Sequence, residues 1–474
     1  MTSDTKQKFD TEDPRNIWVC PDCDSGSGMG THEKPFQSIS SALKKVTPGQ
    51  NIVLMPGIYE GDETIEISGA LKEPIHITAS NKGEVIISGG CWYFYDTSDL
   101  VVSGLTFKNA SHGAISVVGS CLRNRFHNID FRDCGSIGKA SCTFYFGGSG
   151  ARFNLVENCN FIRSNTNGID ELSAKTAIVG LMVSDGNDDN PIANHIVRRN
   201  SFCNYNKAVI LGAGSMGEFE SGHIAEYNKI ENCGFEGITV KCGDVQIRGN
   251  LINGCAGAGI AIAGGGYSII ESNRISASSQ GITVNGAGHT VGNNCFARCQ
   301  FAAVTACGVS ENFEPAENLF IQENTIVECG GADNGAGIII EQSASAIIQK
   351  NLFYGSARAY SCHTGKSVSE NNPQIIISDN LASRGSKPLD GVSIGDIEFS
   401  KLPDDNFENE SGYGACGWVL SADTFDKQAD EAAAAQESYA DAYRLEDEED
   451  EDGGPVIPEE SEAGDVFGKF FGAD

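Results

Sequence analysis

Residues 237–252 read Gly-Ile-Thr-Val-Lys-Cys-Gly-Asp-Val-Gln-Ile-Arg-Gly-Asn-Leu-Ile, and this pattern decides the fold. It returns with variations at 259–275, 281–296 and 337–353. Repetition of this kind is typical of solenoids, in which each repeat buries its apolar face against its neighbours. Because short apolar segments alternate with Gly and Asn, the repeat favours strands and turns over helices.

An asparagine marks one turn of every repeat, and an apolar residue follows two positions later. The marker falls at Asn200, Asn228, Asn250, Asn273, Asn294, Asn324 and Asn351. Asparagine tolerates left-handed backbone and can bond to its neighbours above and below. Strand side chains alternate faces, so Ile238 and Val240 should point inward and stack on the corresponding aliphatic residues of the next repeats. The pattern predicts an all-β, right-handed parallel β-helix.

The ends of the chain differ from the repeat. Residues 1–34 are predicted to form an N-terminal extension, and the β-helix should span residues 35–400. Residues 36–47 look like a short amphipathic helix that caps the first rung and protects its open sheet edge. Residues 401–474 are predicted to be an acidic, largely disordered tail with a short helix and a C-terminal peptide that could dock on a protein partner.

The charge is strongly negative, at −31 for the chain. Residues 401–474 contribute 22 acidic against 4 basic residues, a net of −18, which leaves −13 for residues 1–400. Nucleic acid and anionic membranes are excluded as expected partners because both would be repelled. An anionic polysaccharide would need a local basic patch that acts within a Debye length of about 8 Å.

Targeting signals and cysteines indicate the compartment. Residues 1–16 lack the apolar region of a signal peptide, so a cytoplasmic location is expected unless a native leader is missing from the sequence. The 17 cysteines are then expected to be reduced thiols, most of them small buried core residues. Cys20 and Cys23 resemble half a zinc site, but no second such pair follows. The histidines fall on different rungs, which indicates structural roles.

Several segments resemble known carbohydrate-active β-helices. Residues 57–59, 73–79 and 100–107 resemble the first rungs of pectate-lyase-superfamily proteins. Residues 224–233 (Ile-Ala-Glu-Tyr-Asn-Lys-Ile-Glu-Asn-Cys) and 236–242 (Glu-Gly-Ile-Thr-Val-Lys-Cys) are similar to polysaccharide lyase family 6, which includes alginate lyases and chondroitinase B. The resemblance covers roughly residues 35–355.

This resemblance implies a mechanism and a site. Lys241 matches the catalytic base of the family, which removes the C5 proton of a uronate before β-elimination. Glu236 matches an acidic ligand of the cation, often Ca²⁺, that neutralises the uronate carboxylate. Asn204 or Asn206 on the preceding rung would supply a further oxygen ligand, since hard cations prefer carboxylate and amide oxygens.

The sequence also departs from the family pattern. Ala263 occupies the position where the family has an arginine on the following rung, and Gly234 replaces a second acidic residue. Arg248 and Arg274 lie near the same rungs in the sequence and are the candidates to substitute for the missing arginine.

Two classes of function therefore remain open. The first is an enzyme, a lyase for a uronate-containing polysaccharide or a C5-epimerase that uses the same proton abstraction. The second is a non-catalytic carbohydrate-binding or scaffold β-helix that has lost the lyase site. The retained Glu236 and Lys241 favour the enzyme, whereas Ala263 and the acidic body favour the second class.

Overall fold

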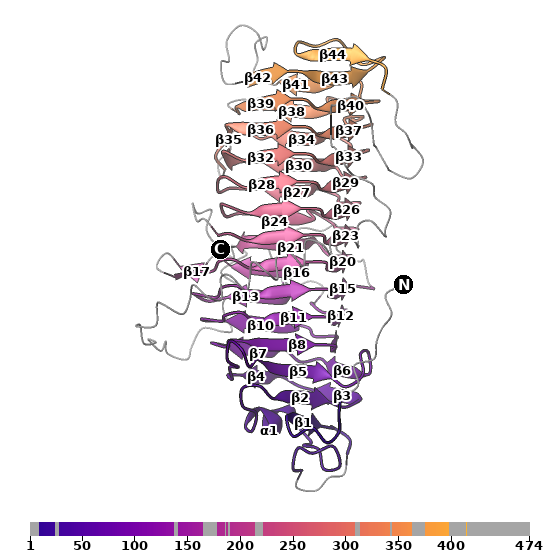
Figure 1. The fold of residues 1–474 in the computed structure, drawn as a ribbon. Helices are drawn as coiled ribbons and strands as arrows, with labels where there is room; N and C mark the ends of the chain where they lie inside the picture. The colour runs from indigo at the N-terminus through magenta and orange to yellow at the C-terminus, as the bar shows by residue number, and fades with distance from the viewer. Residues whose placement is uncertain are drawn as a thin grey trace.

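The chain winds through three long parallel sheets that run side by side along one axis (Figure 1). In this computed structural model, residues 9–23, 28–136, 141–164, 178–184, 186–187, 190–213, 221–308, 313–341, 344–362, 375–397 and 414 are described. Between residues 51 and 383, each turn of the coil adds one strand to sheet A, then one to sheet B, then one to sheet C. The predicted parallel β-helix is confirmed.

The strands of each sheet follow in their stacking order. Sheet A contains β1 (Asn16–Val19), β2 (Asn51–Leu54), β5 (Ile75–Ala79), β8 (Leu100–Ser103), β11 (Arg125–His127), β14 (Leu155–Glu157), β19 (Ile196–Arg198), β22 (Ile224–Glu226), β25 (Gln246–Arg248), β28 (Ile269–Glu271), β32 (Thr290–Gly292), β36 (Leu319–Gln322), β39 (Ala346–Gln349) and β42 (Ile375–Ser378). Sheet B contains β3 (Gly57–Glu60), β6 (Val85–Ser88), β9 (Thr106–Lys108), β12 (Asp130–Arg132), β15 (Asn160–Ile162), β20 (Ser201–Cys203), β23 (Lys229–Glu231), β26 (Leu251–Asn253), β29 (Arg274–Ser276), β33 (Cys295–Ala297), β37 (Thr325–Val327), β40 (Leu352–Tyr354), β43 (Asn380–Ser383) and β44 (Val392–Gly395). Sheet C contains β4 (Glu63–Ile65), β7 (Trp92–Tyr95), β10 (Ile115–Val118), β13 (Ser141–Gly147), β16 (Ile178–Ser184), β21 (Lys207–Ala213), β24 (Ile238–Val240), β27 (Ala258–Ile262), β30 (Gln280–Val284), β34 (Ala302–Ala306), β38 (Ile338–Ile340) and β41 (Tyr360–Cys362).

Two short strand pairs lie outside the three sheets. They join β17 (Gly186–Asn187) to β18 (Asn190–Pro191) and β31 (Gly286–Ala287) to β35 (Ala316–Glu317).

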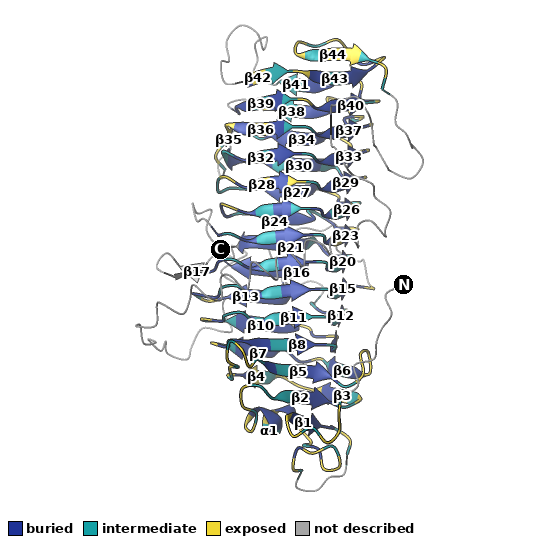
Figure 2. Cartoon of the chain, viewed as in Figure 1, coloured by how far each residue is buried: buried dark blue, intermediate teal, exposed yellow. Residues whose placement is uncertain are grey.

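Aliphatic and aromatic ladders fill the interior of the coil. Ile238 pairs with Ile260 and Ile260 with Ile282, and all three side chains are completely buried. Figure 2 shows the buried residues in dark blue along the strands of the coil. The predicted inward ladder and its register are therefore confirmed.

The asparagines form a second ladder at the two-residue turn between sheets A and B. From Asn200 to Asn380, the backbone N–H of each asparagine donates to Oδ1 of the next one at 2.9–3.0 Å. The left-handed conformation falls on the residue before each asparagine, such as Tyr227 with φ 51° or Lys350 with φ 54°. The stacking prediction is confirmed, whereas the expectation of left-handed asparagines is wrong at these positions.

Buried histidines continue a similar ladder at another corner of the coil. Asn154 N–H donates to Nδ1 of His195 at 3.2 Å, and His195 N–H donates to Nδ1 of His223 at 3.1 Å. Burial lowers the pKa of His223 to about 3, so its imidazole is neutral and can accept this bond at ordinary pH. These two histidines have the structural role predicted for them.

The N-terminal end of the coil differs from the prediction in two details. β1 already stacks on β2, so the first strand lies inside the predicted extension. The capping helix is present but shorter than expected, as α1 (Ile39–Leu43), and the hydroxyl oxygen of Ser38 caps it by accepting from Ser41 N–H. No helix in the described part of the chain is long enough and apolar enough to span a membrane.

The cysteine prediction is wrong at one place. Cys20 and Cys23 form a disulfide, so they are neither reduced thiols nor half of a zinc site. The other described cysteines are free thiols, and most are buried. The predicted tail helix and C-terminal peptide lie outside the described residues.

Gly414 shows where the chain passes after the last strand. Its N–H donates to Lys350 O at 2.9 Å, and a Cβ placed on it would lie 2.4 Å from Thr325 Oγ1 and 3.0 Å from Leu352 Cβ. The outward-facing residues Cys295, Ala297 and Val327 nearby are buried as well. Gly414 therefore packs against the outer side of sheet B.

Gly414→Ala should uncover this part of sheet B, because the new Cβ clashes with Thr325 and Leu352. Burial raises the pKa of Cys295 to about 12, so its thiol should react faster with an alkylating reagent in the variant than in the native protein. Mass spectrometry of labelled peptides measures this rate. Gly385→Ala is the matched control, since Gly385 also has a positive φ of 95° but nothing within 4 Å of its Cβ position. Equal labelling in both variants would contradict the packing of Gly414 on this face.

Candidate functional site

Lys241 lies on the outer face of sheet C, immediately after β24. Ile238 and Val240 are completely buried in the core, so Thr239 and Lys241 point outward. Lys241 N–H donates to Leu211 O at 2.9 Å, which keeps the backbone in register with the preceding rung. The side chain of Lys241 is half-buried. Its outward orientation is the one that a catalytic base would need.

Ala263 lies beside Lys241 on the next rung. Its N–H donates to Val240 O at 2.7 Å, and Thr239 pairs with Ala261 between the same two strands. The outer face beyond Lys241 therefore presents small side chains at Ala261 and Ala263. No arginine stands on this strand at the position next to Lys241.

Glu236 faces outward just before β24 and forms an ion pair with Lys207 on β21. Lys207 Nζ lies 2.9 Å from Oε2 of Glu236, and the two side chains are 18% and 20% exposed. The pairing of Val209 with Ile238 places residues 207 and 236 side by side on neighbouring strands. The angle between the Lys207 ammonium and the Glu236 carboxylate is not that of a hydrogen bond, so the contact is mainly electrostatic. The sequence interpretation did not identify Lys207.

The two asparagine candidates for a metal site do not converge on Glu236. Asn206 is completely buried, and its Oδ1 accepts from the backbone N–H of Ile178 at 2.7 Å. Asn204 lies at the sheet B end of the turn, where its Nδ2 donates to Arg163 O at 2.7 Å and its own N–H bonds to Glu231 O. Neither residue is placed to share a cation with Glu236.

The remaining side chains do not complete a metal site either. Gly234 contributes no ligand, and the described residues contain no group of three His, Cys, Asp or Glu side chains that could hold a metal ion. Ca²⁺ takes about 6–8 oxygen ligands. The described residues around Glu236 therefore do not fit the Ca²⁺ site that the resemblance implies.

The two candidate arginines lie on other faces of the coil. Arg248 is on sheet A, where its Nε lies 2.7 Å from Oε2 of the buried Glu226. Arg274 is on sheet B, where burial lowers its pKa and Leu251 and Cys295 flank it. The structure does not bring either arginine to Lys241, because the tight turns send consecutive strands to different sheets.

An apolar cluster borders the other side of the candidate site. Tyr145, Met182 and Ile210 stack on successive strands of the outer face of sheet C, with Cys142 and Val179 beside them, and all are buried. Thr239 continues this row toward Lys241, and its buried hydroxyl has no hydrogen-bond partner among the described residues. The site thus combines an apolar wall, an unsatisfied hydroxyl and two lysines.

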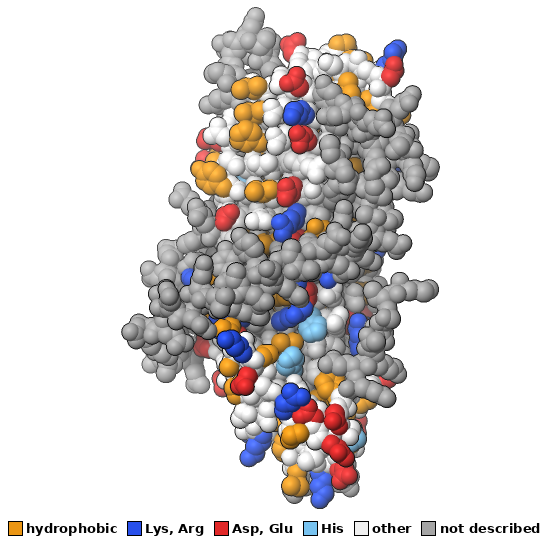
Figure 3. Space-filling view, viewed as in Figure 1, with side chains coloured by type: hydrophobic (Ala, Val, Ile, Leu, Met, Phe, Trp, Pro, Cys, Tyr) orange, Lys and Arg blue, Asp and Glu red, His pale blue; other side chains and the backbone are white. Residues whose placement is uncertain are grey.

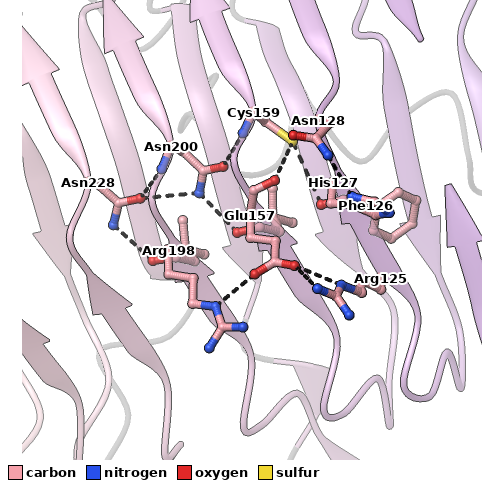
Figure 4. A network of polar contacts seen from close by, with 11 residues as sticks. Arg125, Phe126, His127, Asn128, Glu157, Cys159, Arg198, Asn200 and Asn228 are labelled. Carbon is pink, nitrogen blue, oxygen red and sulfur yellow. Dashed lines mark hydrogen bonds and ion pairs between the residues drawn. The ribbon is translucent and has the colours of Figure 1, made fainter. Parts of the chain in front are cut away.

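A charged network lies elsewhere, on the outer face of sheet A. Glu157 accepts from Arg125 and from Arg198 (Figure 4). One rung further, Glu226 pairs with Arg248. Although burial alone would raise it, the pKa of Glu157 is lowered because the charges of both arginines outweigh the desolvation. On the face viewed in Figure 3, the coloured residues include charges of both signs among hydrophobic side chains. The three arginines and two glutamates of this network pair with one another and leave a net charge of +1.

Comparisons with protein families agree with the fold. A family model described as "Right handed beta helix region" matches residues 180–332, and a model for chondroitinase B matches residues 34–120. A comparison with curated protein sequences finds no match.

Solved structures of family 6 lyases are similar to this chain. The family 6 alginate lyase AlyGC has a TM-score of 0.64 at 18% identity; the match covers 79% of this chain and 55% of AlyGC, so the chain spans about half of that protein. A mannuronic-acid-specific family 6 lyase from human gut microbiota has a TM-score of 0.61 at 19% identity, with 83% and 97% covered. The family 6 lyase from Pseudopedobacter saltans has a TM-score of 0.56 at 18% identity, with 80% and 97% covered. The chain is a right-handed parallel β-helix whose fold resembles that of family 6 lyases.

Proposed function

We propose that the outer face of sheet C around Lys241 binds a uronate-containing anionic polysaccharide and cleaves it by β-elimination. The observation that carries this proposal is the outward, half-buried position of Lys241 directly after β24, in a stretch whose sequence resembles family 6 lyases. The similarity to alginate lyase structures supports the substrate class.

The chemistry needs one base and one group that neutralises the carboxylate. The amine of Lys241 takes the C5 proton of the uronate, and the C5–H electron pair becomes the C4–C5 double bond. The C4–O bond breaks at the same time, and its electron pair leaves on the glycosidic oxygen, which takes a proton from water. The products are a new chain end and an unsaturated uronate.

Lysine acts as a base only when its amine loses its proton, and a desolvated setting or a nearby cation promotes this loss. The apolar cluster with Ile210 and Met182 lies one and two rungs before Thr239 and excludes water from that side. Lys207 on the strand before β24 is paired with Glu236, so this ion pair adds no net charge. Desolvation by the apolar cluster is therefore the influence that supports Lys241 as the base.

Ala263 favours a second function, a β-helix that binds the polysaccharide without cleaving it. The side chain next to Lys241 carries no charge, so transition-state stabilisation from that rung is missing. A C5-epimerase would share the proton abstraction but return the proton to the opposite face of C5.

An assay of the full chain on alginate, chondroitin sulfate and pectin separates these functions. A lyase produces unsaturated uronates, which absorb in the ultraviolet, and its products lack the water that hydrolysis would add. Binding without new absorbance would support the non-catalytic protein, and a changed C5 configuration without cleavage would support an epimerase. Failure to bind or cleave any uronate polymer would reject the proposed function.

A further inference from the structure

We propose that the ammonium group of Lys207 occupies the position of a bound cation at Glu236, so that the carboxylate of a uronate binds a lysine side chain instead of a metal ion. This inference rests on the proposed function and adds to it the group that binds the carboxylate. It also explains the absence of a fitting Ca²⁺ site as a replacement of the cation.

The contact between Lys207 and Glu236 has the geometry of a cation held by one carboxylate. The 2.9 Å separation joins side chains from neighbouring strands on the outer face of sheet C. Each side chain is about four-fifths buried, at 18% and 20% exposure, so water screens this ion pair less than a pair on the open surface. The positive charge is therefore held at a defined place.

The described residues disfavour a metal ion at that place. An additional cation at Glu236 would meet the ammonium of Lys207 at close range, and like charges in a partly buried setting repel strongly. Among the described candidates for a compensating oxygen, Oδ1 of Asn206 accepts from Ile178 inside the coil, and residue 234 is glycine.

Lys207 also lies on the strand next to the one that Lys241 follows, on the same face of sheet C. Lys207 belongs to β21, and Lys241 follows β24, the adjacent strand of the same sheet. Adjacent strands are about 4.8 Å apart, so a sugar ring on this face contacts both rungs. Thr239 lies between residues 236 and 241 on the same face. The carboxylate position at Lys207 and the base position at Lys241 thus lie on neighbouring rungs of one face.

The first test is a Ca²⁺ titration of the full chain by calorimetry and by thermal melting. We expect no binding heat and no change in melting temperature, and we expect EDTA to leave cleavage unchanged. Stoichiometric Ca²⁺ binding that is lost in Glu236→Gln would overturn the inference, and so would loss of cleavage in EDTA that Ca²⁺ restores. Either of these two overturning results would still be compatible with the proposed β-elimination.

The second test compares lysine variants by their affinity for a uronate oligosaccharide. Lys207→Ala should weaken binding about 10- to 100-fold, as expected for loss of one hydrogen bond between charged groups, and added Ca²⁺ should not restore it. Lys207→Arg should retain most of the affinity, because arginine keeps the positive charge and binds carboxylates well. A melting curve checks that each variant is folded.

Lys229→Ala provides the matched control. Lys229 also pairs with a glutamate, at 3.1 Å from Glu231, but on the outer face of sheet B and with 48% of its side chain exposed. Equal affinities in Lys207→Ala and the native protein would reject the role of Lys207. If the native protein binds no uronate polymer, the proposed function and this inference are both rejected. If it binds a uronate polymer only with Ca²⁺, this inference alone is rejected.

Discussion

Lys241→Ala is expected to lower the rate of polysaccharide cleavage about 10²- to 10⁴-fold, the usual contribution of a general base. The fold should remain intact, because the side chain points away from the core and the backbone bond to Leu211 does not depend on it. Initial rates from the ultraviolet absorbance of the unsaturated product measure the effect. Substrate affinity should change much less than the rate.

Lys241→Arg gives a sharper form of the same test. It keeps the positive charge but removes the base, since arginine is not deprotonated in proteins. We expect this variant to be as slow as Lys241→Ala, whereas Lys229→Ala should cleave at the native rate. A native rate in Lys241→Ala would show that another group removes the proton.

Asn250→Ala is expected to give a large loss of stability, about 3–5 kcal/mol, because several buried polar groups lose their partners together. Oδ1 of Asn250 accepts from the backbone and the side chain of Asn228, at 2.9 and 3.0 Å. Its Nδ2 donates to Ala225 O at 2.9 Å and to Oδ1 of Asn273 at 2.9 Å. Urea unfolding measures the loss, and hydrogen exchange should show opening that begins at the rungs of β22 to β29.

Asn253→Ala is the control for this substitution. Asn253 is exposed on β26, where its Oδ1 accepts only from Ser276 Oγ at 2.9 Å among the described residues. Its loss should stay within about 0.5 kcal/mol, as for ordinary surface substitutions. Similar losses for the two variants would show that the asparagine ladder does not stabilise the coil.

The fold could be predicted from the sequence because a solenoid repeats the same local requirement on every rung. Alternation at Ile238 and Val240 gave the inward ladder, and the recurring asparagine gave the turn. The residue with left-handed backbone could not be identified in the same way, since Tyr227, Glu323 and Lys350 have no common side-chain chemistry. The disulfide between Cys20 and Cys23 was missed because the expected compartment outweighed their spacing.

The candidate site was predictable only in part. Register alone placed Lys241 beside Ala263, because both follow core strands of the same sheet. Lys207, the partner of Glu236, lies 29 residues earlier in the sequence (236 minus 207) and belongs to the preceding rung. No local sequence pattern therefore joins the two residues. Arg248 and Arg274 are near in sequence but face away, since residues after a tight turn enter a different sheet.

The most direct test is a crystal structure of Lys241→Ala with a uronate oligosaccharide bound. The sugar should lie across the outer face of sheet C, with its carboxylate at Lys207 and Glu236 and its C5 facing position 241. An oligosaccharide bound on sheet A or sheet B, or with its carboxylate away from Lys207, would contradict the account.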